Sequence, residues 1–216
     1  FAGEYTGGGA GAVVWNGGTI SFNPYAVLRL TNGGFHWRSG SFDYRLVNQG
    51  RLILDGGTCS IGYGATLSNE GQLTQTNESL LYNGSGFFNN EEGGVHDLLA
   101  DGSNVTSYIA YGGGLYRNYG LLRKSGGMGT SLVHSAFFNL GGTVDVQRGT
   151  LMLQNWNGQS SNGVFTVAQD AALNINGGYN TSFAGEYTGG GAGPVVWDGG
   201  EISFNPWAVI HFTNGG

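Results

Sequence analysis

Short runs of alternating apolar and polar residues, separated by glycine- and asparagine-rich breaks, extend along the whole chain. Breaks of the type Asn-x-Gly, each followed by such a run, begin at Asn48, Asn69, Asn118 and Asn139. Alternation over four to eight residues is the period of a strand with one buried face. Glycine and asparagine suit the breaks because they adopt left-handed backbone conformations at low cost. The pattern predicts many short strands joined by tight turns.

The breaks recur at a nearly constant spacing. The spacing from Asn48 to Asn69 is 21, and it is 21 again from Asn118 to Asn139, while Asn89 follows Asn69 by 20. The gap from Asn89 to Asn118 is longer, at 29. A single coil of about 20 residues cannot bury its apolar side chains, whereas stacked coils align them in ladders and pair their strands. We therefore predict an all-β, right-handed parallel β-helix (β-solenoid) with coils of about 20 residues and asparagine ladders at its corners.

A longer repeat contains this shorter one. Residues 1–34 return at 183–216 with 27 of 34 positions identical, so that Phe1 corresponds to Phe183. The replacements keep apolar or polar character, as where Trp207 stands in place of Tyr25. We therefore predict that residues 1–182 are one complete repeat unit, and that 183–216 begin the next unit of the same continuous solenoid. The chain is expected to be a segment of a longer tandem array.

Composition narrows the class of protein. Glycine supplies 44 of 216 residues, yet 39% hydrophobic and 13% aromatic content argues against disorder. A net charge of −6 argues against a nucleic-acid partner, and no apolar run approaches the length that spans a bilayer. Only 10% of residues are charged, and Lys124 is the sole lysine. With abundant glycine, asparagine, serine and threonine, this composition favours an extracellular or cell-surface location.

A family resemblance supports the same fold. The stretch FFNLGGTVDVQRGTLMLQ (137–154), preceded by YRNYGLLRKSGGMGTSLV (116–133), resembles the repeats of large bacterial surface and autotransporter-type parallel β-helix proteins. The likeness covers about 40 residues well and the remainder as a looser rhythm. It implies secretion and a scaffold or adhesive role. It implies no particular ligand and no catalytic residues.

The densest group of ionisable residues comprises Glu91, Glu92, His96, Asp97 and Asp101. The group falls in the long gap between breaks, so we expect it on a loop that leaves the regular coil. Such a loop could hold a hard cation or an acid–base pair, or carry ordinary surface charges. Elsewhere charged residues are scattered singly, unlike the clusters used by polysaccharide-degrading β-helix enzymes. The sequence predicts no enzyme, no catalytic residue, no cofactor and no metal site.

Aromatic residues provide candidate contact surfaces. Phe35 and Trp37 share one strand face, and Tyr111, Tyr116 and Tyr119 cluster around a glycine break. Exposed aromatic rings could stack on sugars or contact neighbouring fibres. The alternative is that these side chains fill corners of the fold.

Two further features concern modification and redox chemistry. Four Asn-x-Ser/Thr sequences are candidate glycosylation sites, at Asn77, Asn83, Asn104 and Asn180. The single cysteine, Cys59, excludes a disulfide framework. Its thiol is expected to be buried and inert, with pairing to a partner chain as the alternative.

The leading hypothesis is a structural component of an extracellular or cell-surface fibre, built from tandem β-solenoid repeats that stack end to end. Its expected partners are adjacent repeat units, with neighbouring fibres and surface glycans as further candidates. The alternative is a carbohydrate- or surface-binding adhesin module. A polysaccharide-degrading β-helix enzyme is the third and weakest reading.

Overall fold

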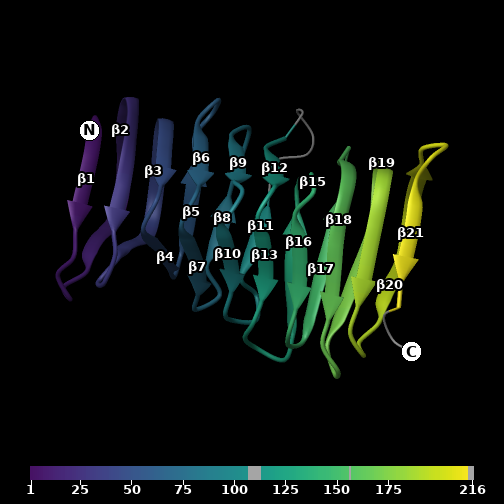
Figure 1. Cartoon of the computed structure of the whole chain (residues 1–216). Coiled ribbons are helices and arrows are strands. Elements are labelled where there is room, and N and C mark those ends of the chain that lie inside the picture. The colour runs from purple at the N-terminus through teal and green to yellow at the C-terminus, as the bar shows by residue number, and fades with distance from the viewer. Residues whose placement is uncertain (107–112, 156, 214–216) are drawn as a thin grey trace.

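The chain folds as a parallel β-solenoid of about nine turns, with about 22 residues in each turn. The computed structural model describes residues 1–216 except 107–112, 156 and 214–216. The turns stack side by side from the N-terminal to the C-terminal end (Figure 1), and the described part of the chain contains no helix. The predicted fold class is confirmed, with turns slightly longer than expected.

Each regular turn contributes three short strands, which lie on three faces of the solenoid that we call A, B and C. The strands confined to face A are β4 (Arg51–Asp55), β7 (Gln72–Thr76), β10 (Val95–Leu98), β13 (Leu121–Lys124), β16 (Thr143–Val146) and β21 (Val209–Phe212). Those on face B are β5 (Thr58–Ile61), β8 (Leu80–Tyr82), β11 (Asn104–Thr106), β14 (Thr130–His134) and β17 (Thr150–Asn155). Those on face C are β1 (Gly3–Gly7), β6 (Thr66–Asn69), β9 (Phe87–Asn90), β12 (Leu115–Asn118) and β15 (Ala136–Asn139).

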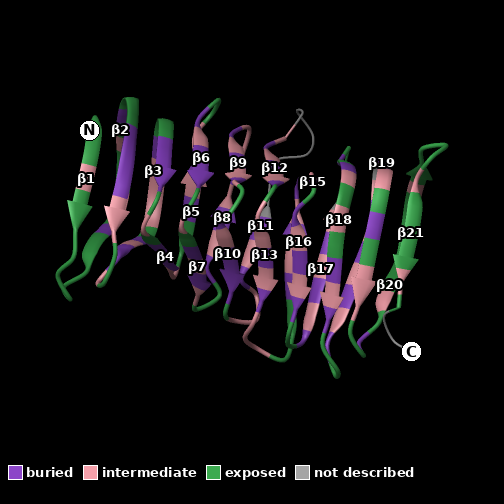
Figure 2. Ribbon diagram, in the orientation of Figure 1, coloured by how far each residue is buried: buried purple, intermediate pink, exposed green. Residues whose placement is uncertain are grey.

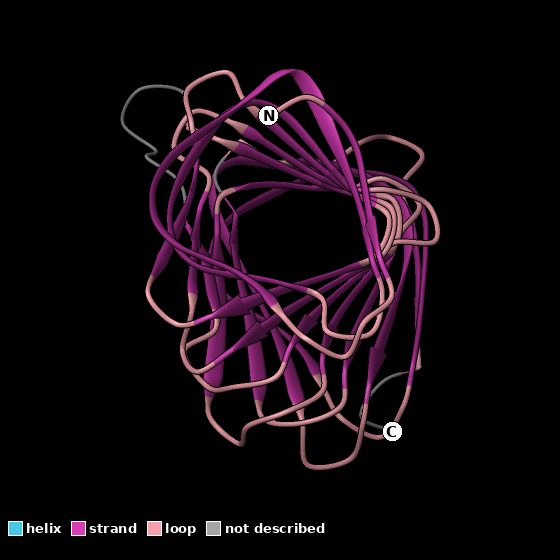
Figure 3. Ribbon diagram, turned by 90° about the vertical axis from the view of Figure 1, so that its left-hand side faces the viewer, coloured by secondary structure: helices cyan, strands magenta, loops and turns pink. Residues whose placement is uncertain are grey.

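Longer strands near both ends bend around the corners and belong to more than one face. They are β2 (Val13–Leu30), β3 (Phe35–Asn48), β18 (Gln159–Val167), β19 (Ala172–Gly190) and β20 (Val195–Phe204). Seen from the N-terminal end, the strands form a continuous wall around the axis (Figure 3).

Inward side chains from successive turns lie over one another and form the core. On face C one such ladder contains Leu46, Leu67, Phe88, Tyr116 and Phe137, which pair in register and are buried. Within it the rings of Phe88 and Tyr116 stack at 4.4 Å between centroids. Each ladder position is covered by the turns before and after it, so burial depends on continued stacking.

The two copies of the 34-residue repeat share their local conformation. Gly3 and Gly185 both have positive φ, at 88° and 76°. The Trp15 indole donates to the carbonyl of Gly17 at 2.7 Å, and the indole of Trp197 makes the equivalent bond to Gly199 at 2.8 Å. The copies differ at residues 23–25, which continue strand β2, whereas 205–207 form a turn between β20 and β21.

Two sequence-based expectations are wrong in detail. Asn90, and not Asn89, pairs with Asn69 and Asn118, so the true intervals are 21 and 28 residues. The ionisable group does not lie on a loop as a whole, because His96 and Asp97 belong to strand β10. The additional length of this turn lies after β10, on both sides of β11.

Candidate functional site

The feature that most clearly joins one turn to the next is a row of buried asparagines, which we call the asparagine ladder. Each side-chain amide donates to the Oδ1 atom of the next member at 2.7–2.8 Å. The ladder consists of Asn48, Asn69, Asn90, Asn118 and Asn139, all of them buried. The predicted asparagine ladder is thereby confirmed.

The first four ladder amides also hold the backbone of a neighbouring turn, whereas the amide of Asn139 donates to the carbonyl of Gly142 in its own corner. The second N–H of Asn69 donates to the carbonyl of Val95 at 3.0 Å, and that of Asn90 donates to Leu121 at 3.1 Å. Nearly all the hydrogen-bonding capacity of these buried amides is therefore used, which offsets the cost of removing them from water. The ladder begins at Asn48, because the residue before it in register is Leu28. It ends at Asn139, whose backbone N–H donates to the hydroxyl of Ser160.

A second buried polar cluster crosses the interior of the solenoid. His96 Nε2 lies 2.7 Å from Gln75 Oε1, and its Nδ1 lies 2.8 Å from the hydroxyl of Tyr116. Burial lowers the pKa of His96 to about 3 and raises that of Tyr116 well above its usual value. The imidazole is therefore neutral, and this cluster links β7 with β10 and β12 of the next turn by hydrogen bonds between uncharged groups.

The four acidic residues of the predicted ionisable group either accept hydrogen bonds from neighbouring groups or lie in a turn. Asp97 accepts from Arg123 at 2.5 Å and from the hydroxyl of Ser125 at 2.7 Å. Asp101 accepts the backbone N–H of Gly129 at 2.7 Å and lies 3.4 Å from the buried ammonium of Lys124. Glu91 and Glu92 lie in the turn before β10. Within the described residues, no group of three or more His, Cys, Asp or Glu side chains is placed to hold a metal ion.

The structure separates the five candidate aromatic residues. Trp37 is fully buried and stacks on Trp15 with 5.0 Å between ring centroids, and Phe35 is also buried. Tyr116 belongs to the core, so three of the five are not surface contacts, because they face inward. Tyr119 is exposed, and Tyr111 lies outside the described residues.

The candidate glycosylation sites differ in accessibility. Asn77 and Asn180 are exposed and have positive φ, as is common in turns. Asn104 is partly buried, and its Oδ1 accepts the backbone N–H of Leu132 at 2.7 Å. Asn83 is fully buried and donates to Ser135, which closes it to an attached glycan in the folded chain.

Cys59 is buried, in agreement with the interpretation of an inert thiol. Its sulfur lies 3.1 Å from the carbonyl oxygen of Trp37, and burial raises the pKa of the thiol to about 12. A thiol that stays protonated is a weak nucleophile.

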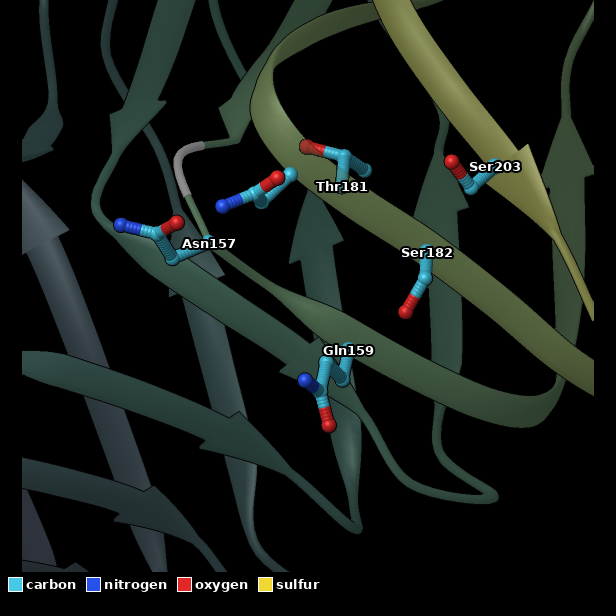
Figure 4. Close-up of a pocket in the computed structure, with 6 residues that line it drawn as sticks. Asn157, Gln159, Thr181, Ser182 and Ser203 are labelled. Atoms are coloured by element: carbon cyan, nitrogen blue, oxygen red, sulfur yellow. The ribbon is translucent and has the colours of Figure 1, made fainter.

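Sequence analysis missed a polar groove of about 300 Å³ on the last turns of face C. Ser182 pairs in register with Gln159 of the preceding turn and with Ser203 of the following one, so three turns contribute (Figure 4). The lining residues carry amides or hydroxyls and no charge; they are Asn157, Gln159, Asn180, Thr181, Ser182 and Ser203. Polar residues at intervals of 23 and 21 were the signal that sequence analysis could have used.

Comparison with protein-family models, with characterised proteins and with solved structures found no match for the chain. Within the described residues, no helix has the length and apolar character needed to cross a membrane.

Proposed function

We propose that this chain is a structural segment of an extracellular or cell-surface fibre built from tandem β-solenoid repeats. Its action is mechanical: stacked strands give length and stiffness, and each unit covers the exposed edge of its neighbour. The low content of charge and lysine supports the proposed location.

The observation that carries the proposal is the continuity of the solenoid across the repeat boundary. Strand β19 runs from Ala172 to Gly190 and so passes through residue 183, where the second unit begins, without a break. On either side of it, β18 and β20 pair with β19 in parallel. A boundary of this kind allows units to be added without a linker, as a stiff fibre requires.

The asparagine ladder supports a mechanical role in the same unit. Its bonds run from turn to turn, parallel to the direction in which a fibre would be stretched. Pulling the turns apart would therefore require breaking buried amide contacts together with the strand pairs. Such buried amides lack water as an alternative partner, which makes their separation costly.

Electron microscopy of the native material tests the fibre directly. We expect thin, unbranched filaments in which each repeat unit adds about 40 Å of length, from a strand spacing of about 4.8 Å and between eight and nine turns per unit. Discrete globular particles would contradict the proposal.

A second candidate function is carbohydrate binding, favoured by the polar groove. Its uncharged amides and hydroxyls match the hydrogen-bonding groups of neutral sugars, although none of its lining residues is aromatic. Glycan-array binding should be lost in the double variant Gln159→Ala, Ser182→Ala. It should persist in the control Gln147→Ala, since that amide is exposed outside the groove. Equal binding by both variants would remove this candidate.

A further inference from the structure

The two copies of the 34-residue repeat differ sharply in the exposure of the same apolar positions. Trp15, Phe22, Val27 and Leu28 are 7, 3, 7 and 4% exposed, whereas their counterparts Trp197, Phe204, Val209 and Ile210 are 58, 49, 44 and 42% exposed. Exposed residues are concentrated at the two ends of the solenoid (Figure 2). Three of these four positions carry the same residue and the fourth replaces leucine by isoleucine, so the difference in exposure comes from what lies over them.

In the first copy the covering segment is strand β3. Trp37 stacks on Trp15 with ring planes 6° apart, and Phe42 lies 5.5 Å from Phe22 between ring centroids. Val47 pairs in register with Val27. Residues 35–48 are therefore complementary to the edge formed by residues 13–28, and to the strand positions of that edge that recur at 195–204 and 209–210.

The register also places the two copies on different faces of the solenoid. Trp15 pairs with Trp37 on face A, and Gly40 occupies face B of the same strand β3. From Gly40, seven register steps along face B lead to Trp197; they pass through Cys59, Leu81, Val105, Val133, Leu153 and Ile175. The path from Trp15 to Trp197 therefore consists of one turn from Trp15 to Trp37, one third of a turn from face A to face B, and seven further turns. One repeat unit thus spans eight and one third turns.

We propose that the edge at residues 195–212 is the docking surface for the continuation of the second repeat unit, whose counterpart of residues 35–48 covers it, and that each unit is thereby rotated by one third of a turn relative to the preceding one. This inference rests on the proposed fibre. Any surface feature of the unit, the polar groove included, would then appear on three sides of the fibre and return to the same side every third unit. Three units span about 25 turns, or about 120 Å.

The docking part is tested by comparing two alanine variants in two chains. In the 216-residue chain, Trp15→Ala should lower the urea midpoint of unfolding strongly and Trp197→Ala only slightly, because Trp197 is largely exposed. In a two-unit chain, made of residues 1–216 followed by 35–216, a copy of residues 35–48 follows the first Trp197, and Trp197→Ala at that internal position should lower the midpoint as much as Trp15→Ala does. A persistently small effect of Trp197→Ala in the two-unit chain would overturn the docking.

The rotation is tested by gold labelling of a six-unit chain that carries Tyr63→Cys in every unit. Tyr63 is 93% exposed, whereas the native Cys59 is buried and should remain unlabelled. Electron microscopy should show gold on three sides of the rod, with the same side recurring at about 120 Å. Labels moved to Met128→Cys should give the same winding, displaced around the axis.

The labelling experiment distinguishes a failure of the proposed rotation from a failure of the proposed fibre. Straight rods with gold in a single row at about 40 Å spacing would leave the fibre standing and overturn the rotation. Globular particles would contradict both.

Discussion

At the scale of single residues, the asparagine ladder should contribute far more than its neighbours in sequence. Asn90 donates to Asn118 and to Leu121 and accepts from Asn69, whereas Asn89 is partly exposed and accepts a long hydrogen bond from Arg117 at 3.4 Å. Asn90→Ala leaves buried groups without partners, at about 1–3 kcal/mol each. We expect a loss of about 2–4 kcal/mol in the free energy of unfolding, measured with urea.

Asn89→Ala is the matched control, because the two residues are adjacent and chemically identical. Its effect should stay within about 0.5 kcal/mol, as is usual for surface changes. Equal losses in the two variants would mean that the amide ladder adds nothing to stability.

His96 should make the protein sensitive to mild acid. Its pKa is lowered to about 3 in the folded chain and is about 6.5 when unfolded, so below about pH 6.5 only the unfolded chain takes up the proton. Stability is therefore fully present above that pH and is lost as the pH falls toward 3. The expected contribution is about 2 kcal/mol between pH 7 and pH 5.

His96→Leu checks this assignment, because Leu73 and Leu122 occupy the same ladder position in the adjacent turns. The variant loses hydrogen bonds to Gln75 and Tyr116, but its stability should decline less steeply between pH 7 and pH 5 in urea titrations. Identical pH slopes in both proteins would contradict the role of His96.

At the scale of elements, the glycines of three Asn-x-Gly turns, Gly50, Gly71 and Gly120, should be required by close stacking. A Cβ atom on Gly71 would lie 2.4 Å from the carbonyl oxygen of Gly50 in the turn below. Gly71→Ala should therefore cost about 1–3 kcal/mol, as overpacking does. Gly9→Ala should be nearly neutral, because a Cβ atom there meets nothing within 4 Å. Equal thermal midpoints for the two variants would refute tight stacking of the turns.

These turns were predictable from sequence because alternation, asparagine and glycine repeat together at a near-constant interval. The choice between Asn89 and Asn90 was not, since two adjacent asparagines differ by one residue and only the register decides which faces inward. For the same reason Phe35 and Trp37 could be assigned to one face, but not to the inner one.

The burial of His96 could not be predicted from the sequence for a different reason. Its partners, Gln75 in the preceding turn and Tyr116 on another face of its own turn, are 21 and 20 residues away. A buried histidine looks polar in a sequence, and only the stacked turns show that its two nitrogen atoms have partners. The polar groove likewise draws its lining from three turns.

At the scale of the whole molecule, the repeat matters more than any single contact. Each turn buries its core against its neighbours, so the ends of the described solenoid carry exposed apolar residues such as Trp197 and Phe204. Exposed strand edges invite pairing with further chain. A unit that continues the solenoid removes one such edge and recreates it one unit further along.

Small-angle X-ray scattering of chains with one, two and three repeat units tests the central claim most directly. Each added repeat unit should lengthen the particle by about 40 Å while the radius of its cross-section stays constant. A cross-section that widens with each unit, without that increase in length, would contradict the stacking of successive turns along one axis.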